Sequence, residues 1–241
     1  MLLAVSFVFS LPAADARSPI GPLSGRTIAV DPGHNGRNYA HPAEINRIVN
    51  AGTLWKPCDT TGTATRAGYT EAAYTLNVAL RLQAILRAEG ARVVLTRKTN
   101  DGWGPCITTR AAIGNRARAD AAISIHADGG PPSGRGFHVI YPPSIAGLTD
   151  DIAAASKRLA LDVRTAFRAG TGMPYATYAG SHGLAVRSDL GGLNLSDVPK
   201  VFVETGNMRN TTDAALLTSP RFREREARAL AAGLAAFLAR R

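Results

Sequence analysis

The chain has 241 residues, 45% of them hydrophobic and 19% charged, which excludes a disordered protein and suffices for one domain with a sizeable core. Its formal net charge of +10 suits an anionic partner, or else reflects a basic surface that is merely solvated. Nucleic acid is a poor candidate for that partner, because the basic residues are scattered and only 6% of the residues are aromatic.

The first sixteen residues, MLLAVSFVFSLPAADA, have the features of a signal peptide. An apolar run from Leu2 to Leu11 is followed by Ala14-Asp15-Ala16, an A-x-A cleavage signal. The usual positively charged start is missing, as in a truncated signal. A core helix is the alternative, and Pro12 argues against it. We therefore expect an exported protein of the periplasm, the cell wall or the medium. The run is too short to span a membrane, so no stable insertion is expected after its removal.

The two cysteines, Cys58 and Cys106, both lie in loops rich in Gly, Pro or Thr. In an exported protein such a pair is expected to form a disulfide. Closing that loop would contribute about 4 kcal/mol on the chain-entropy model. The alternative is two free thiols, and two cysteines are too few for a structural zinc finger.

Apolar runs and helical spacing divide the chain into alternating strands and helices. Strands are predicted at residues 26–31, 91–96, 120–125, 137–141, 184–187 and 200–203. Helices are predicted at residues 71–90, 107–118, 148–169 and 220–239. Residues 35–69 lack clear periodicity, and the chain from residue 213 to the last helix is expected to be a loop. This order predicts one α/β domain, with a mostly parallel twisted sheet and helices on both faces.

Four residues with reactive side chains lie where predicted elements end or begin. His34 follows the first strand, His126 the third and Glu204 the last, and Glu71 starts the first long helix. The carboxyl ends of parallel strands form the rim where α/β sheets bind ligands, so we expect these side chains to meet there. Two imidazoles and one carboxylate suit zinc, which in catalytic sites keeps a fourth position for water.

The chemistry requires one glutamate on the metal and one beside it. Zinc lowers the pKa of a bound water from about 15.7 to about 7, and a second carboxylate can take its proton and pass it to a leaving amine. Each residue also has a structural interpretation. Glu71 would stabilise a helix N-terminus, His126 would be a hydrogen-bonded core residue, and Glu204 would pair with an arginine. Spacing alone leaves these alternatives open.

The order of the motifs resembles one enzyme family. The matching segments are Val30-Asp-Pro-Gly-His34-Asn-Gly, Glu71 with Asn77 and Leu80, Val94-Leu-Thr-Arg97, Arg110 with Asn115, Ile123-Ser-Ile-His126-Ala-Asp and Val203-Glu-Thr-Gly-Asn-Met-Arg-Asn210. They are similar to the zinc-dependent N-acetylmuramoyl-L-alanine amidases of the amidase 3 type, and among these to the small, single-domain, mycobacterial-type cell-wall enzymes. The resemblance covers about residues 26–240.

The resemblance implies a peptidoglycan hydrolase with one zinc ion per chain. It would cleave the amide between N-acetylmuramic acid and the L-alanine of the stem peptide, in cell-wall turnover. His34, Glu71 and His126 fall on the zinc ligands of the family, and Glu204 falls on its catalytic glutamate.

Arg187 and three histidines are not assigned a role by the family match. Arg187 ends a predicted strand, where it would meet a stem-peptide carboxylate or form a structural ion pair. His41, His138 and His182 are not assigned to the metal.

Two departures from the family matter. The first histidine and the glutamate ligand are commonly closer, so residues 38–69 look like an insertion. Cys58 lies in it, and we expect a cover over part of the substrate groove, tethered by the disulfide to Cys106. No wall-binding domain accompanies the catalytic domain within residues 26–240. Without a heptad or exposed apolar strip, a monomer is expected.

Two other functions remain open at this stage. A non-catalytic peptidoglycan-binding or regulatory protein would keep the fold without activity, and the four filled catalytic positions argue against it. A zinc peptidase would cut within the stem peptide. The residues alone do not separate peptide from amide cleavage, and only the family resemblance does.

Overall fold

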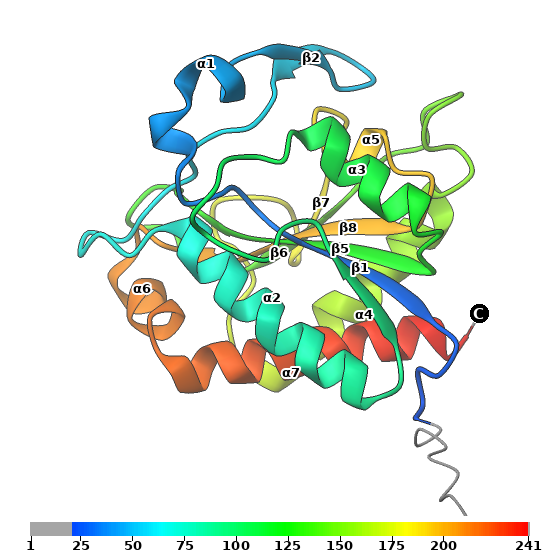
Figure 1. The fold of residues 1–241 in the computed structure, drawn as a ribbon. Helices are drawn as coiled ribbons and strands as arrows, with labels where there is room; N and C mark the ends of the chain where they lie inside the picture. Colours follow the sequence, from blue (N-terminus) through cyan, green and yellow to red (C-terminus); the bar gives the residue numbers. More distant parts are fainter. Residues whose placement is uncertain (1–20, 241) are drawn as a thin grey trace, which may run out of the picture.

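A six-stranded sheet lies at the centre of residues 21–240, the part of the chain that this computed structural model describes (Figure 1). Its strands, in spatial order, are β4 (Arg92–Leu95), β1 (Thr27–Pro32), β5 (Ala121–Asp128), β8 (Lys200–Asn207), β6 (His138–Tyr141) and β7 (Leu184–Val186). The first four are parallel to one another, whereas β6 is antiparallel to β8 and parallel to β7. The mostly parallel sheet is confirmed. The predicted signal peptide lies outside the described residues.

Three long helices cover one face of the sheet and enclose the main core. They are α2 (Glu71–Ala88), α4 (Ala153–Thr171) and α7 (Pro220–Leu238). The strand residues that face them are β-branched and apolar, as in strands buried on both faces; examples are Val30, Ile123 and Val203, all with 0% exposure. Helix α2 begins where the sequence predicts, because the Thr70 hydroxyl accepts a hydrogen bond from the amide of Ala73.

The opposite face of the sheet is polar and is covered by α3 (Ile107–Arg116) and the short α5 (Gly191–Asn194). Asp31 of β1 accepts hydrogen bonds from Arg110 at 2.8 Å, Thr96 at 2.6 Å and Ser124 at 2.8 Å, and lies 3.6 Å from the Lys200 ammonium. Burial alone would raise the pKa of Asp31, but Arg110 and Lys200 outweigh it and hold that pKa well below its usual range. The predicted helices on both faces are thus confirmed.

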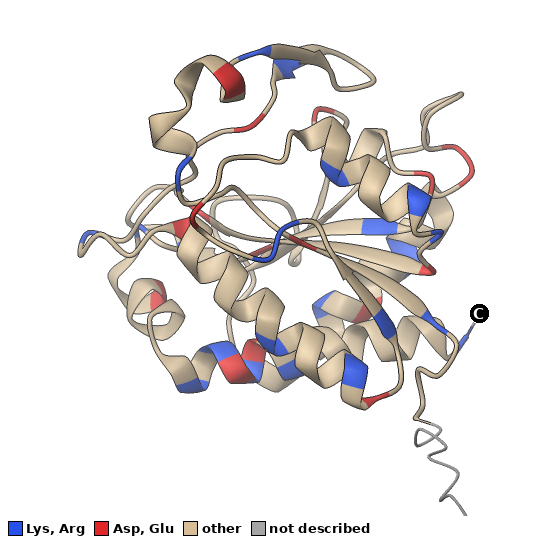
Figure 2. Cartoon of the chain, in the orientation of Figure 1, with Lys and Arg blue, Asp and Glu red and all other residues tan. Residues whose placement is uncertain are grey.

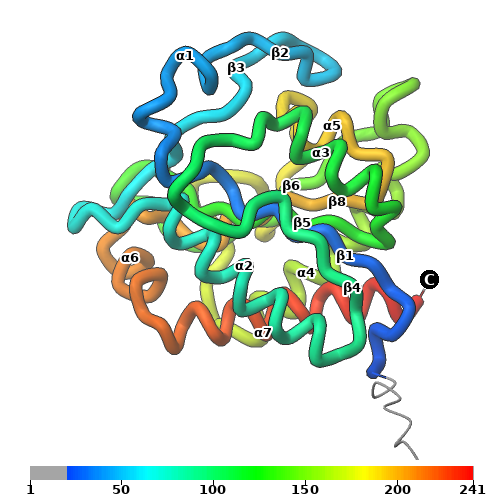
Figure 3. The backbone as a smooth tube through the Cα atoms, viewed as in Figure 1, coloured from blue at the N-terminus to red at the C-terminus, as the bar shows by residue number. Residues whose placement is uncertain are grey.

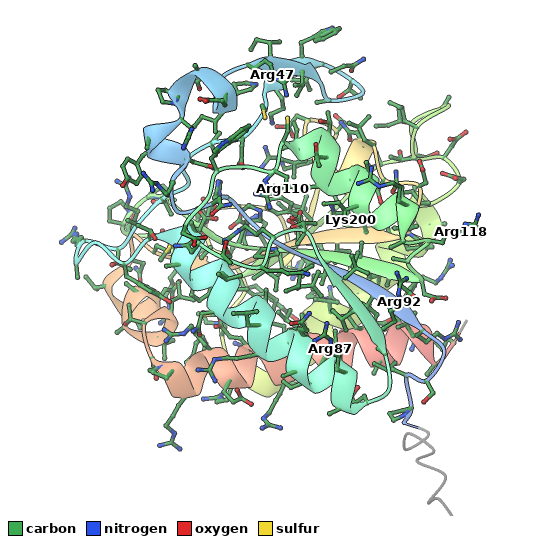
Figure 4. All side chains as sticks on the ribbon, in the orientation of Figure 1. Arg47, Arg87, Arg92, Arg110, Arg118 and Lys200 are labelled. Atoms are coloured by element: carbon green, nitrogen blue, oxygen red, sulfur yellow. The ribbon has the colours of Figure 1, made fainter. Side chains whose placement is uncertain are left out.

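Figure 4 distinguishes this internal charge cluster from the surface charges. Arg110 and Lys200 lie inside, near α3 and the sheet, whereas Arg87, Arg92 and Arg118 lie at the outer surface and are exposed. Figure 2 shows the remaining Lys and Arg spread over the helical layers and mixed with acids, while the top of the molecule carries few charges. Among residues 21–240, no helix is long and apolar enough to cross a membrane.

The predicted insertion is a folded excursion above the sheet (Figure 3). It contains a 3-10 helix η1 (Asn38–Ala40), α1 (Pro42–Ile45) and a hairpin of β2 (Ile48–Asn50) and β3 (Trp55–Pro57). These elements have only three or four residues each, too few for a periodic pattern to appear in the sequence.

The hairpin is fastened to the loop before α5. Lys56 Nζ donates to the carbonyl of Asp189 at 2.8 Å, and Asn194 Nδ2 donates to the carbonyls of Ala51 at 2.9 Å and Ser188 at 2.8 Å. The excursion, which begins after β1, is therefore hydrogen-bonded to α5 and to the loop before it.

The cysteines of the two loops are neighbours, but the predicted disulfide is not formed in this structure. Cys58 and Cys106 are both buried free thiols, and the amide of Ile107 donates to the carbonyl of Cys58 at 2.8 Å. Burial, and then a hydrogen bond to Cys106, raise the pKa of the Cys58 thiol to about 12. The contact of the two segments is confirmed, and the covalent bond stays a prediction.

Several element boundaries differ from the predictions by a few residues, most of all those of β5, β8 and α4. Strands β5 and β8 continue to Asp128 and Asn207. The prediction ended each strand with its apolar run, but the polar residues that follow also adopt the extended backbone of a strand. Helix α4 begins at Ala153, later than predicted. Residues expected to be loop form α6 (Thr211–Leu217), whose N-cap Asn210 accepts hydrogen bonds from the amides of Thr212 and Asp213.

We expect Arg110→Ala to lower the free energy of unfolding by about 3–5 kcal/mol, because it leaves the buried carboxylate of Asp31 without its main partner. Arg116→Ala, an exposed change on the same helix, should cost no more than about 0.5 kcal/mol. Denaturant unfolding of both variants measures the difference. Equal losses would show that the buried ion pair contributes nothing specific.

Candidate active site

Three of the four predicted site residues converge above the carboxyl ends of β1 and β5. Glu71 Oε1 lies 3.2 Å from His34 Nε2 and 2.9 Å from His126 Nδ1. The three candidate donor atoms all lie within 4.8 Å of one another. Two imidazole nitrogens and a carboxylate oxygen at this spacing fit a catalytic zinc site with an open fourth position.

The other atoms of these residues are held by the protein, as metal ligands require. His34 Nδ1 lies 3.0 Å from the carbonyl of Thr60, which selects the tautomer with a proton on Nδ1 and leaves Nε2 free to bind a metal. Glu71 Oε2 accepts from the amide of Thr63 at 3.0 Å. Thr60 and Thr63 both belong to the predicted insertion, which therefore orients two of the three donors.

The carboxylate of Glu71 attracts positive charge to the cluster. Burial would lower the pKa of His34, but the carboxylate of Glu71 and a hydrogen bond to Asp59 outweigh burial and raise that pKa to about 10. Burial lowers the pKa of His126. Although burial alone would raise the pKa of Glu71, the two histidines hold it well below its usual range. Glu71 is thus a buried carboxylate whose charge is balanced here by a proton on His34, and a metal cation would replace that proton.

Two glycines are required by the closeness of the ligands. A Cβ on Gly33 would lie 2.1 Å from Cε1 of His126. A Cβ on Gly62, where φ is +74°, would lie 2.7 Å from Cδ2 of His34 and 2.8 Å from Oε2 of Glu71. No side chain fits at either position without displacing a ligand.

Two buried arginines fix the loop that carries His34. This residue has φ of 56°, a conformation that is unusual outside glycine and needs support. Arg110 donates to the carbonyl of His34 at 2.9 Å, and Arg97 donates to the carbonyls of Gly33 at 3.0 Å and Ala72 at 2.7 Å. Arg97 thereby joins the His34 loop to the first turn of α2, next to Glu71.

Glu204, the fourth predicted residue, lies within β8 and is paired in register with His126 of β5. The parallel register places both side chains on the same face of the sheet. Burial, and then the nearby carboxylates of Glu71 and Asp128, raise the pKa of Glu204 well above its usual range. A carboxyl group with a raised pKa keeps a proton more readily than an ordinary one.

A cavity of about 350 Å³ contains this cluster. The donor residues and Glu204 line its floor, and Lys56, Pro57 and residues 59–63 of the insertion form a wall opposite residues 190–192. Phe202 stacks on His126 with ring centroids 3.8 Å apart. The cavity thus combines charged and polar groups with apolar side chains such as Phe202 and Leu190, as in sites that bind an organic substrate.

Arg187 is not among the residues that line this cavity. It forms a two-pronged ion pair with Asp189, at 2.9 Å and 2.6 Å, as the structural alternative predicted. Contact with a substrate carboxylate stays a prediction.

Comparison with known proteins identifies the family. The model of the family described as N-acetylmuramoyl-L-alanine amidase (Amidase_3) matches residues 28–236. The chain belongs to this family. It is therefore a member of a group of peptidoglycan hydrolases, and the predicted fold and resemblance are confirmed.

Mycobacterial amidases are among the similar proteins. The N-acetylmuramoyl-L-alanine amidase Rv3717 of Mycobacterium tuberculosis is 44% identical over 220 residues, covering 90% of this chain and 88% of that protein. The crystal structure of the amidase Ami1 from Mycobacterium smegmatis superposes with a TM-score of 0.85 at 43% identity, covering 91% of this chain and 99% of that chain. Apo Ami1 from Mycobacterium abscessus gives a TM-score of 0.83 at 44% identity, covering 89% and 99%.

The sequence analysis missed the residues that hold the ligands. Asp59, Thr60 and Thr63 come from a segment without periodicity, and nothing in the sequence marks them as neighbours of His34 and Glu71. For Gly33, the sequence offered only its place in the Pro32-Gly33 turn directly before His34.

We expect Gly62→Ala to weaken zinc binding by about 10- to 100-fold, because the methyl group displaces His34 and Glu71 from their holding contacts. Gly68→Ala is the matched control, since Gly68 has φ of +84° but no heavy atom within 4 Å of its Cβ position. Competition with a chromophoric chelator measures both affinities. Equal weakening in the two variants would attribute the effect to backbone strain instead of the ligand contact.

Proposed function

We propose that this protein is a zinc-dependent amidase that cleaves the bond between N-acetylmuramic acid and the L-alanine of the stem peptide. The observation that carries the proposal is the convergence of His34, Glu71 and His126 on one point of a cavity that Glu204 also lines. Family membership supplies the substrate, because the geometry alone suits amide or peptide bonds equally.

Each residue has a definite task in this reaction. His34, Glu71 and His126 would hold one zinc ion per chain, which supplies a Lewis acid for the carbonyl and acidifies a water molecule. Glu204 accepts the proton of the attacking water and later delivers it to the amine of the leaving L-alanine. Its raised pKa suits this return of the proton, since a carboxylate with an ordinary pKa holds a proton poorly at neutral pH.

The excursion of residues 38–69 is proposed to cover part of the substrate groove. Its hairpin is bonded across to the loop before α5, and Lys56 and Pro57 line the cavity. A disulfide between Cys58 and Cys106 would tether the cover in an oxidising compartment. Such a compartment follows from the substrate, which lies outside the cytoplasmic membrane, and from the signal peptide predicted at residues 1–16. A monomer remains the expected form.

We expect Glu204→Gln to keep about one zinc per chain and to lose at least about 1,000-fold in kcat on muramoyl dipeptide, because a neutral amide of the same shape cannot take the proton. Metal analysis and product release measure the two effects. Mass analysis of the wild-type products should show free L-alanyl-D-isoglutamine. Cleavage after L-alanine would instead establish a stem-peptide peptidase, and full activity of Glu204→Gln would remove this residue from the mechanism.

We expect a shortened hairpin to widen the range of substrates. Val49 and Lys56 are directly paired, so a Gly-Asn turn can replace residues 50–55 while Asp59, Thr60 and Thr63 stay in place. Zinc content and turnover of muramoyl dipeptide should be retained, and hydrolysis of cross-linked peptidoglycan should rise several-fold. An unchanged preference between the two substrates would refute the cover.

A further inference from the structure

His138 is a buried histidine that the mechanism above does not use. It is 3% exposed, and its Nδ1 has no hydrogen-bond partner among the residues that the structure describes. Leaving a buried ring nitrogen unpaired is unfavourable. A histidine in this place therefore calls for a polar group or a water molecule beside it.

The sheet register places His138 next to the proposed base. His138 of β6 is directly paired with Glu204 of β8, and on the other side of β8 Glu204 is paired with His126 of β5. Directly paired residues point to the same face of a sheet, with Cβ atoms about 4.5–5.5 Å apart. A metal-ligand histidine, the base and a second histidine thus form one row across three strands.

Glu204, like His138, has a buried polar atom that lacks a hydrogen-bond partner in the described part of the chain. Its Oε2 is buried and has no hydrogen-bond partner within residues 21–240, whereas Glu71 accepts from the amides of Thr63 and Ala127. Proton transfer depends on a fixed orientation of the base. The carboxylate of Glu71 therefore accepts hydrogen bonds on both oxygens, whereas Oε2 of Glu204 lacks a donor.

The surroundings of His138 favour this donor role. Burial lowers its pKa, so the ring is neutral at neutral pH and carries a single N–H. Tyr178 packs edge-on against the ring, with centroids 6.2 Å apart and an interplanar angle of 88°. Behind Tyr178, a Cβ on Gly130 or Gly134 would come within 2.6 Å of the phenol ring. This packing restricts the movement of His138.

We propose that His138 is a positioning residue for Glu204. Through one bridging water molecule, the Nδ1–H of neutral His138 holds Glu204 Oε2 in place and leaves the other carboxylate oxygen to take the proton. The inference rests on the proposed role of Glu204. Asp128 is the competing acceptor, because its charge also acts on His138.

Two substitutions separate the hydrogen bond from the packing. In His138→Asn, the side-chain amide places a donor near the position of Nδ1, whereas His138→Phe fills the same space without one. We expect His138→Phe to lower kcat by about 10- to 100-fold, with KM and zinc content within twofold of wild type. His138→Asn should recover most of that loss. Arg116→Ala, an exposed change on α3 outside the cavity, is the control. A fall in zinc content, a rise in KM, or equal loss in the Asn and Phe variants would overturn the proposal.

A spectroscopic readout does not depend on turnover. The ring ¹⁵N resonances of His138, assigned by their loss in His138→Asn, should show a protonated Nδ1 that shifts in Glu204→Gln and stays in place in Asp128→Asn. The opposite response would assign His138 to Asp128. Kinetically, His138→Phe should cause no further loss in the Glu204→Gln background.

The role of Glu204 as the base and the role of His138 in positioning it can be tested separately. If Glu204→Gln is fully active, the proposed base is wrong, and the role of His138 fails with it. If Glu204→Gln is inactive while His138→Phe retains wild-type kcat, only the positioning role fails.

Discussion

The arrangement of the site depends on the hydrogen bonds that the buried guanidinium of Arg110 donates. Its donors reach the side chains of Asp31 and Asp59 and the carbonyls of Pro32, His34, Gly104 and Pro105. A buried arginine is tolerated only when its five N–H groups are satisfied and its charge is balanced. Satisfying them brings together the end of β1, the insertion and the loop before α3, which are distant in sequence. The position of His34 follows from this constraint.

The sheet divides its two faces between stability and chemistry. One face is apolar and packs against α2, α4 and α7, where burial of β-branched side chains stabilises the fold. The other face carries Asp31, Ser124 and Lys200 inside, and His126, Glu204 and His138 at the strand ends. Because side chains alternate along each strand, one register determines both the core and the row of catalytic candidates.

Helix α2 links the two faces. Its body packs against the apolar side, and its first residue, Glu71, reaches the cluster at the end of the sheet. The insertion completes the site from above, with its backbone groups on His34 and Glu71 and its hairpin bonded to the loop before α5. A segment that looks like an addition to the family fold is thus part of the support for two candidate ligands. This explains why the cavity wall and the ligand contacts come from the same stretch of chain.

The sequence alone determined the alternation of strands and helices, because hydrophobic periodicity and caps such as Thr70 act locally. It also predicted the four candidate site residues His34, Glu71, His126 and Glu204, through their places at strand and helix ends and through the family resemblance. Only the tertiary structure decided the antiparallel pairing of β6 with β8, which puts His138 beside Glu204. It likewise decided that Asp59, Thr60, Gly62 and Thr63 surround the ligands, that Arg187 pairs with Asp189, and that Asn210 starts an additional helix. Pairing, register and loop closure depend on contacts between residues far apart in the chain, and no local pattern records them.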